Sequence, residues 1–480
     1  MHRPTGQPGQ LARTLLRWAV RIAAVSVIGW WLFADTYARH WGTGGRPNEI
    51  RFAHFGTFRD YELWRSIIEA FEHEYPGTGE AGSLTGKTDS PVSIRQEYVV
   101  GLAGHYNVKL RQQILSGTLP DVALVQLGPF HEIADHFADL SHLADALSAP
   151  DALDPTGVAA FRSLGRQAGL PVSGGNLMIY CNTVCFERAG KPALPGRLHG
   201  TGVPLPRDDW TIDDFLQTAR LLTCDFDGDG SLDQFGFWLP RWVYYLPFLW
   251  SFGGDVTSDG DTRWALTDQA AHQALAFYRS LAVGDRVCPR DEEVPQLFQD
   301  VGFLTGKVAM CVNGPWFEPF LAETQLADTY VVRPIPKGPA GRKTRITWDG
   351  IVIARDLPAG RRQIAERFVA FVLSKTVQDR IARTGRALPA RIASVAAYLG
   401  TPVDPRRRCF VDGLAYSRTQ PLLAAFGEVD RAINRHLDRL LDPRRAANVA
   451  QVLDDLASDP VIVRHFPTSR ANAQELERGR

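Results

Sequence analysis

The sequence has no excess of either charge. Its 480 residues carry 53 Lys and Arg against 53 Asp and Glu, so the formal net charge is zero. Nucleic-acid-binding proteins usually show a basic balance or a concentrated basic stripe, and the chain has neither. We therefore predict no nucleic-acid partner.

Cysteine is scarce, and the six cysteines are widely scattered. No Cys-x-x-Cys pair occurs, which argues against zinc and thioredoxin-like chemistry. An extracytoplasmic protein can form disulfides, but the sequence alone does not pair these residues. Cys181 and Cys185, four residues apart, are interpreted as structural.

The sequence also lacks the common catalytic signatures. It contains no Gly-x-Ser-x-Gly, no His-Glu-x-x-His and no phosphate-binding loop. A glycosidase would need two facing carboxylates about 5–10 Å apart, and no such pair can be identified. We predict that the protein is not an enzyme and requires no cofactor; a secreted glycosidase remains the less favoured alternative.

No apolar run is long enough for an ordinary membrane-spanning helix. The run 22–34 has 13 residues, whereas a spanning helix needs about 20. Arginines at positions 3, 13, 17 and 21 precede it, and a positive segment before an apolar one is typical of a secretory signal. We predict that residues 1–47 are an export signal that is either removed or retained as a membrane anchor. Both outcomes place the rest of the chain in the periplasm or another extracytoplasmic space.

The remaining sequence is long enough for two domains and shows alternating strand and helix patterns. The expected strands are 49–55, 92–100, 121–125, 176–180, 235–237, 308–312, 330–335 and 350–354. The expected helices are 60–75, 106–115, one beginning after Trp210, 267–281, 361–373 and 376–384, followed by a mostly helical tail. The β-α-β-α-β order at the beginning predicts a parallel sheet with covering helices.

An Asp-rich turn at 225–237 stands between the N-capped helix start at 209–215 and an aromatic block at 238–250. Sugars present apolar ring faces and a rim of hydroxyls, so a sugar site needs aromatic plates and planar polar groups. This arrangement of segments therefore indicates a protein that binds polar ligands such as sugars.

The spacing of residues in the Asp-rich turn also matches the first half of a calcium-binding EF-hand loop. Asp225, Asp227, Asp229 and Gly230 have that spacing, and Asp233 takes the ninth position. The twelfth position is Gly236, so the bidentate glutamate is missing. Calcium could bind the abbreviated loop in a purely structural role; a hydrogen-bonded Asx turn is the alternative interpretation.

Four stretches together carry a family signature. They are 210–215 leading into 225–237, 303–310 running to Asn-Gly-Pro-Trp at 313–316, 365–371 with 374–378, and 385–391. Their order and spacing resemble the extracellular solute-binding proteins of ABC importers, specifically the sugar branch similar to maltose-binding protein. The resemblance extends from about residue 48 to about residue 460.

The resemblance implies a two-lobed α/β periplasmic-binding-protein fold of type II. Each lobe would hold a mainly parallel sheet with flanking helices, and hinge closure would bury the ligand in the cleft between lobes. The implied lobes are residues 48–170 with 335–388, and 171–334 with 389–460; residues 461–480 form a C-terminal tail. Gly174-Gly175, residues 334–336 and the loop near Pro389 would then be hinge strands.

The same resemblance suggests most of the ligand-binding residues. Trp316 would be a stacking aromatic, and Trp348 and Asp349 would contact ligand from a loop before a strand. The implied contacts from the aromatic block and the C-terminal helices are Arg241, Trp242, Tyr244, Tyr245 and Phe426. His54 and Gln126 are added because ligands bind at the carboxyl ends of parallel strands. A role in the core is the alternative for Trp316 and for the aromatic block. An exposed turn is the alternative for Trp348 and Asp349, and a structural role is the alternative for His54, Gln126 and Phe426.

Where the family commonly has an acidic hydroxyl-binding residue, this chain has Arg241 or Gly174. Because arginine pairs with carboxylate and phosphate bidentately, an acidic sugar or a glycerol phosphodiester stays open beside a neutral sugar.

The predicted function is that of a monomeric substrate-binding component that delivers a sugar or oligosaccharide to an ABC permease pair in the cytoplasmic membrane. The alternative is an anchored periplasmic sensor or docking subunit with the same fold.

Overall fold

The computed structural model describes residues 48–76, 91–101, 103–147, 153–189, 202–239, 241–290, 293, 299–445 and 447–467. The predicted export segment 1–47 and most of the predicted tail 461–480 lie outside these residues. None of the helices in the described residues has the length and apolar character that a membrane span requires.

The chain forms two compact units, residues 1–123 with 356–365 and residues 124–355 with 366–480. We call these the first and the second unit and consider each by itself. The lobe boundaries expected from the family resemblance concern segments that move together, and they stay a prediction.

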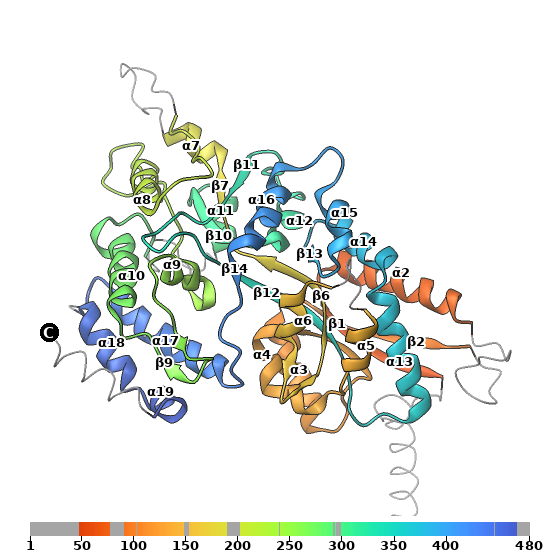
Figure 1. Cartoon of the computed structure of the whole chain (residues 1–480). Coiled ribbons are helices and arrows are strands. Elements are labelled where there is room, and N and C mark those ends of the chain that lie inside the picture. Colours follow the sequence, from red (N-terminus) through yellow and green to blue (C-terminus); the bar gives the residue numbers. More distant parts are fainter. Residues whose placement is uncertain are drawn as a thin grey trace, which may run out of the picture. The chain divides into compact units, whose positions relative to one another are not determined.

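The first unit begins with strand β1 (Glu49–Gly56), helix α2 (Phe58–Glu74), strand β2 (Ser93–Val100) and helix α3 (Ala103–Leu115). The chain leaves this unit within strand β3 (Val122–Gln126). β1 pairs in parallel with β2 along its whole length and with the start of β3, which confirms the predicted β-α-β-α-β order. Helix α2 packs on β1 and β2 (Figure 1).

A capping box sets the beginning of α2. The Asp60 carboxylate accepts hydrogen bonds from the backbone N–H and the hydroxyl of Thr57, at 2.6 and 2.8 Å. Such a box satisfies backbone groups that have no partner inside the helix. The apolar side of α2 then buries Trp64, Ile68 and Phe71.

The second unit holds most of the remaining elements. Its helices are α4 (Leu127–Ile133), α5 (Ser141–Ala146), α6 (Pro155–Ala160), α7 (Thr183–Ala189), α8 (Ile212–Leu221), α9 (Leu246–Ser251), α10 (Gln269–Arg279), α11 (Gln299–Leu304), α12 (Glu318–Leu321), α14 (Lys375–Arg383), α15 (Val395–Leu399), α16 (Pro405–Gly413), α17 (Phe426–Leu441), α18 (Val449–Ala457) and α19 (Pro460–His465). Helix α13 (Ala359–Val372) begins in the first unit and ends in the second.

The strands of the second unit pair mainly antiparallel. Its longer strands are β6 (Leu170–Asn176), β7 (Met178–Asn182), β10 (Met310–Asn313), β11 (Tyr330–Arg333) and β12 (Thr344–Ile353), and two-residue strands include β13 (Leu388–Pro389) and β14 (Ser417–Arg418). β6 lies antiparallel to β12 and β13, and β7 lies antiparallel to β10 and β11. The second unit thus contains several antiparallel pairs, whereas the pairs that β1 forms in the first unit are parallel.

Two local predictions for the second unit are wrong. Residues 235–237 form no regular strand, only a single bridge between Phe235 and Val308. The loop expected at 348–350 is part of β12, which begins at Thr344.

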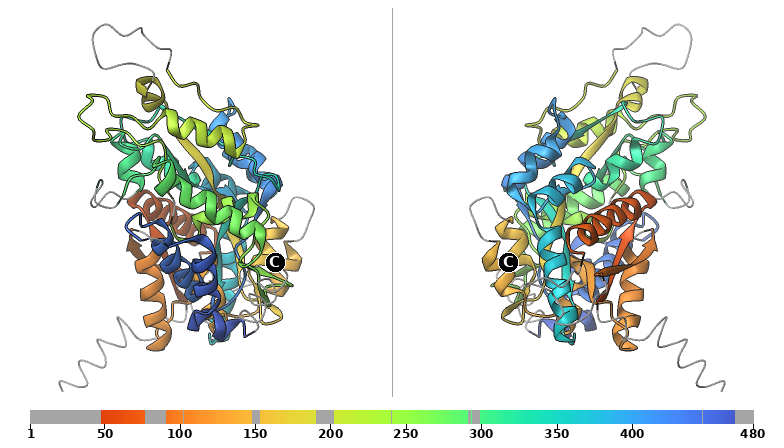
Figure 2. Two further views of the ribbon diagram at one scale, coloured as in Figure 1. Left: turned by 90° about the vertical axis from the view of Figure 1, so that its left-hand side faces the viewer. Right: turned by 90° about the vertical axis from the view of Figure 1, so that its right-hand side faces the viewer.

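The core of the second unit joins helices from distant parts of the sequence. Phe215 of α8, Tyr278 of α10, Ile433 of α17 and Val452 of α18 are all buried in one apolar cluster. Helix α18 lies beside both α10 and α17 (Figure 2). The predicted helices around Trp210 and at 267–281 are thus confirmed, with α10 continued by a π-helical turn at Ser280–Gly284.

Candidate functional site

Two adjacent glycines in β6 each lie against a tryptophan. A Cβ atom added to Gly174 would come within 2.6 Å of the Trp348 ring, and one added to Gly175 within 2.8 Å of the Trp316 ring. Because successive side-chain positions of a strand point to opposite faces, the two indoles lie on opposite sides of β6. The glycine pair is needed here for close approach of the rings to the backbone.

Trp316 is the half-buried member of this pair. It follows β10 in the short helix η4 (Pro315–Phe317), and its ring also lies against Gly314, where an added Cβ would be 2.3 Å away. The outer edge of the indole is therefore held against glycine backbone while part of the side chain stays accessible. A fixed, partly exposed ring is the geometry that stacking on a sugar face requires.

Trp348 and Asp349 lie within β12 and not in a loop. Trp348 is 1% exposed, and its ring packs near Gly157 as well as Gly174. Its indole Nε1 has no hydrogen-bond partner among the described residues. Asp349, the next residue along the strand, is half-buried. The structure thus gives Trp348 a position in the core, and a ligand role for it stays a prediction.

The aromatic block contributes a ring pair of which Trp242 is exposed and Tyr244 is half-buried. Trp242 and Tyr244, in the short helix η2 (Trp242–Tyr245), stack with ring centroids 6.0 Å apart and an interplanar angle of 29°. Trp242 is 56% exposed and has a φ of +56°. A non-glycine residue in this region costs free energy, and such residues cluster at functional sites. Its backbone N–H donates to Asn434 Oδ1 of α17, at 2.6 Å.

Tyr245 and Phe426 are buried, 1% and 2% exposed respectively. Both belong to the apolar core of the second unit. Tyr245 is the last residue of η2, and Phe426 is the first residue of α17.

A buried polar group lies next to these aromatics and was missed by the sequence reasoning. Asp430 of α17 is 1% exposed, and Arg345 of β12 is 4% exposed. Arg345 donates through Nε and Nη2 to Gln420 Oε1, at 3.0 and 2.7 Å. Burial raises the pKa of the Asp430 carboxyl to about 7, while Arg345 opposes that shift. Burial likewise lowers the pKa of the Arg345 guanidinium to about 10.

One sequence signal could have found Asp430. Helix α17 is strongly amphipathic, and its buried side holds Phe426, Val429, Ile433 and Leu437. Asp430 lies four residues after Phe426, so the helical period places its carboxylate on the same apolar side. A carboxylate in that position is rarely buried without a partner or a function.

Arg241 is exposed and forms an ion pair with Asp438 of α17, with Nη1 and Oδ1 3.4 Å apart. The alternative of an acidic ligand depended on the Arg241 guanidinium. This guanidinium already has the Asp438 carboxylate beside it.

His54 and Gln126 occupy different environments. His54 lies inside β1, which continues to Gly56, so its expected place at the strand end is wrong. It is 0% exposed, and its Nε2 lies 2.8 Å from Gln96 Nε2 within an aromatic cluster that includes Tyr98. Gln126 is the last residue of β3, as predicted, and is half-buried.

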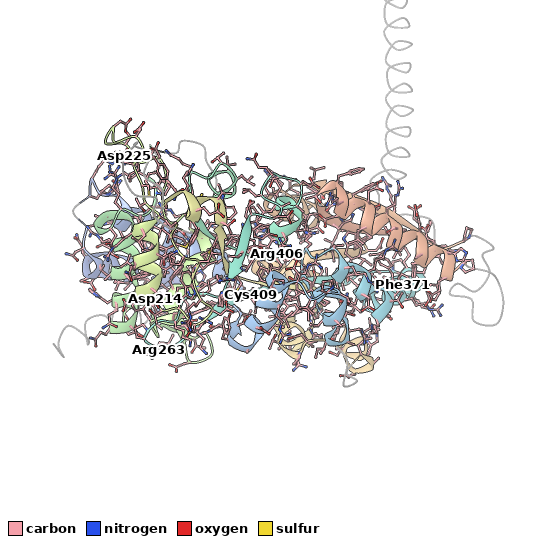
Figure 3. The ribbon with its side chains drawn as sticks, turned by 90° about the horizontal axis from the view of Figure 1, so that it is seen from above. Asp214, Asp225, Arg263, Phe371, Arg406 and Cys409 are labelled. Atoms are coloured by element: carbon pink, nitrogen blue, oxygen red, sulfur yellow. The ribbon has the colours of Figure 1, made fainter. Side chains whose placement is uncertain are left out.

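The Asp-rich turn folds as a compact loop on the outside of the second unit (Figure 3). Asp225 accepts hydrogen bonds from the N–H groups of Gly228 and Gly230, at 2.7 and 2.9 Å. These bonds, that from Gly230 foremost, lower the pKa of the Asp225 carboxyl. Asp233 accepts from the N–H of Phe226 at 2.7 Å. The carboxylate oxygens of Asp225, Asp227 and Asp229 lie within 4.8 Å of one another.

A separate cavity of about 350 Å³ opens elsewhere in the second unit. Its lining includes Asn182, Cys185, Arg188, Leu304 and Thr329. Arg188 donates to Gln234 Oε1 and to the carbonyl oxygen of Gly306, at 2.8 and 2.9 Å. None of the predicted ligand-binding residues lines this cavity, so it is distinct from the aromatic site.

Solved structures with the same fold come from several bacteria. An ABC substrate-binding protein from Listeria monocytogenes, Lmo0181, solved in complex with cycloalternan, is 19% identical with a TM-score of 0.71, covering 87% of this chain and 99% of that one. Maltose-bound MalE3 from T. maritima is 19% identical with a TM-score of 0.68, covering 86% and 98%. UgpB from Mycobacterium tuberculosis, in complex with glycerophosphocholine, is 20% identical with a TM-score of 0.69, covering 88% and 99%.

These likenesses show the type II binding-protein fold that the sequence predicted. No curated protein sequence matches the chain significantly. Residues 57–379, well over half of the sequence, match the family described as bacterial extracellular solute-binding protein. The chain belongs to this family of extracellular solute-binding proteins.

Proposed function

We propose that the protein is the substrate-binding component of an ABC importer that captures a sugar or oligosaccharide outside the cytoplasm. The observation that carries the proposal is Trp316, whose half-buried ring is fixed against the backbone of Gly175 and Gly314. The exposed ring of Trp242, stacked on half-buried Tyr244, adds a second aromatic surface. The saccharides named for the Listeria and T. maritima proteins are ligands of the same class.

In the proposed mechanism the open protein stacks a sugar ring on Trp316, closes about its hinge strands, and presents the closed form to a permease pair. Hinge closure around a ligand is the usual switch of such binding proteins. The chain has no phosphate-binding loop, so the energy for transport would come from a separate ATPase. The export segment 1–47 would place the monomeric protein on the outer side of the membrane, released or anchored.

The first prediction concerns Trp316. A ligand that binds only the native state at a hundredfold excess over its Kd stabilises the protein by about 2.7 kcal/mol. We expect a neutral saccharide among maltotriose, trehalose and tagatose to raise the melting temperature of the full-length protein. Trp316→Ala should weaken this binding by roughly tenfold or more, because aromatic stacking and area burial are both lost. The measurement is a thermal-shift titration, followed by calorimetry.

Phe320→Ala is the matched control, because Phe320 is 49% exposed in the neighbouring helix α12. This variant should bind as the wild type does. Unchanged binding by Trp316→Ala would remove Trp316 from the site. A folded wild-type protein that no saccharide stabilises would contradict sugar capture and favour an anchored sensor or docking subunit.

For the Asp-rich loop we propose a structural calcium site. Gly230, at the sixth loop position, has a φ of +91°, which fits the sharp turn that EF-hand loops make there. Three carboxylate oxygens within 4.8 Å of one another fit calcium–oxygen distances of about 2.3–2.6 Å. Asp225, Asp227 and Asp229 would hold the ion, with Asp233 also expected to contribute.

The calcium proposal predicts a stability difference. CaCl₂ should raise the melting temperature of EDTA-treated full-length protein, and Asp229→Asn should abolish the increase. Asp213→Asn, an exposed carboxylate change in α8, should leave it intact. A melting temperature that is the same with CaCl₂ and EDTA would leave the loop as a hydrogen-bonded Asx turn.

A further inference from the structure

A buried carboxylate lies two residues after the tryptophan on which the proposed sugar capture depends. Glu318 is 6% exposed and is the first residue of α12. Its backbone N–H donates to the carbonyl oxygen of Pro315 and thereby closes η4, the short helix that contains Trp316. The backbone of Glu318 and the Trp316 side chain therefore belong to one continuous turn.

The Glu318 side chain connects this turn to two helices from a distant part of the sequence. Its Oε2 lies 3.6 Å from Nε of Arg407 in α16. Arg407 is itself held in place, because its Nη1 donates to the carbonyl oxygen of Tyr398 in α15 at 2.9 Å and its guanidinium lies over the Tyr398 ring. The ion pair thus links the segment that contains Trp316 to α15 and α16.

Trp316 also packs against the apolar cluster that surrounds this ion pair. Phe317, Leu321 and Tyr398 are buried members of the cluster, and Trp316 is a half-buried ring packed against it. Protein interiors are densely packed and transmit strain. A change in the force on the first turn of α12 will therefore reach the indole ring.

The ionisable groups that face Glu318 come from four elements. They are Asp404, Arg406 and Arg407 at the beginning of α16, Tyr398 of α15, Tyr330 of β11 and Tyr180 of β7. Asp404 is already paired with Arg406, whose Nη2 lies 2.9 Å from Asp404 Oδ2. Arg407 is therefore the cation that balances Glu318.

The Glu318 carboxyl changes its charge near neutral pH. Burial raises its pKa to about 7, while Arg407 opposes the shift and Asp404 adds to it. Above this pH the carboxylate and the guanidinium attract each other, more strongly than they would in water. As the pH falls through this value the carboxyl takes up a proton and the attraction is lost. An exposed glutamate, with a pKa of about 4.3, would stay ionised throughout this range.

We infer that Glu318, paired with Arg407, is a positioning residue for Trp316 and makes ligand capture pH-dependent, with tighter binding when Glu318 is ionised. This inference rests on the proposed function and adds regulation of the same site. In this arrangement the ionised pair holds the first turn of α12 against α16 and so keeps the Trp316 ring in place. Protonation of Glu318 releases that turn.

The first test needs no ligand and follows Trp316 itself. Full-length protein labelled with 5-fluorotryptophan gives fluorine NMR signals, and the signal that Trp316→Phe lacks belongs to Trp316. Its chemical shift should titrate with a midpoint at a pH of about 7. Glu318→Gln should abolish this transition. Arg407→Gln should move the midpoint to higher pH, because the cation that favours the carboxylate is lost. Asp412→Asn, a change of an exposed carboxylate in α16, should titrate as the wild type does.

The second test measures affinity by isothermal titration calorimetry at about pH 5.5 and about pH 8.5. The probe is maltotriose, trehalose or tagatose, whichever stabilises the protein most. The wild type should bind it about fivefold more weakly at the lower pH, the lower end of usual coupling between two sites. Glu318→Gln should bind with the same affinity, within twofold, at both pH values. Because linkage is reciprocal, saturating saccharide should lower the midpoint of the Trp316 signal by about 0.7 pH unit.

The possible failures are distinguishable. A Trp316 signal that does not titrate near neutral pH, or that titrates unchanged in Glu318→Gln, would overturn the inference. Wild-type affinity that differs less than twofold between the two pH values would also overturn it and leave the ion pair a feature of the core alone. If Glu318→Gln does not fold, the direction of the shift in Arg407→Gln decides.

Failure of the proposed function gives a different result. Folded wild-type protein that binds no saccharide at either pH would overturn sugar capture. The fluorine titration would then still show whether Glu318 controls the environment of Trp316.

Discussion

Replacing Gly236 by alanine is expected to destabilise the second unit by about 3 kcal/mol or more, the upper end of what overpacking costs. A Cβ atom at this position would lie 2.0 Å from the carbonyl oxygen of Ala219 in α8 and 2.7 Å from its Cα. Both contacts are to backbone, so no side-chain rotation relieves them.

The segment around Gly236 also cannot shift away. The Phe235 N–H donates to Lys307 O and its carbonyl accepts from Ala309 N, both at 2.9 Å, while the Gly236 N–H donates to Thr223 Oγ1 at 3.1 Å. The clash must therefore displace α8 from a core in which Phe215 is fully buried. Thermal and urea denaturation of the purified full-length variant measure the loss.

Gly284→Ala is the control for this prediction. An added Cβ there meets only Ser280 Cβ, at 3.8 Å, so we expect a change within about 0.5 kcal/mol. If Gly236→Ala melts within the same narrow range as Gly284→Ala, the close approach of α8 to this turn is incorrect.

The second large effect is expected from Asp121→Ala in the first unit. Asp121 is 1% exposed and Arg361 is 6% exposed, and the Arg361 guanidinium donates to Asp121 Oδ2. The same oxygen accepts from the Arg51 N–H at 2.7 Å. Removing one partner of a buried ion pair costs about 3–5 kcal/mol, because the other charge stays desolvated. Denaturant unfolding should show a loss of this size.

A double variant separates charge from packing. Asp121→Ala with Arg361→Met should lose less than the sum of the two single variants, since no uncompensated charge remains in the core. Asp412→Ala is the surface control: Asp412 pairs with Arg408 at 2.8 Å, and both side chains are more than half exposed. Exposed pairs contribute at most about 1 kcal/mol. If Asp121→Ala loses as little free energy of unfolding as Asp412→Ala, the buried ion pair of Asp121 with Arg361 is contradicted.

The candidate site could be predicted from the sequence only in part. Trp316 was selected because Asn-Gly-Pro-Trp ends a strand in an order that the family shares; the structure places it half-buried, and its ligand role stays a prediction. Asp430 and Arg345 were missed because they lie in segments that are far apart in the sequence. Their meeting depends on how α17 packs against η2 and on the side chain of Gln420, which sequence spacing does not report.

The sequence by itself determined the local structure and the family. The capping boxes Thr57/Asp60 and Thr211/Asp214 and the apolar periodicity of α2 and α10 depend on residues within a few positions of each other, so short-range chemistry suffices. The family could be predicted from the order of four motifs along the sequence, without the tertiary structure.

Only the tertiary structure decided which of two tryptophans is half-buried and which belongs to the core. Trp316 and Trp348 both lie against a glycine of β6, yet one is half-buried and the other is 1% exposed. The difference arises because β12 pairs with β6 in the register that sets Trp348 opposite Gly174, while Trp316 reaches Gly175 on the other face. Whether a side chain is buried depends on which distant segments cover it. The pairing of β12 with β6 joins residues more than a hundred positions apart, so it is fixed by packing and not by local sequence.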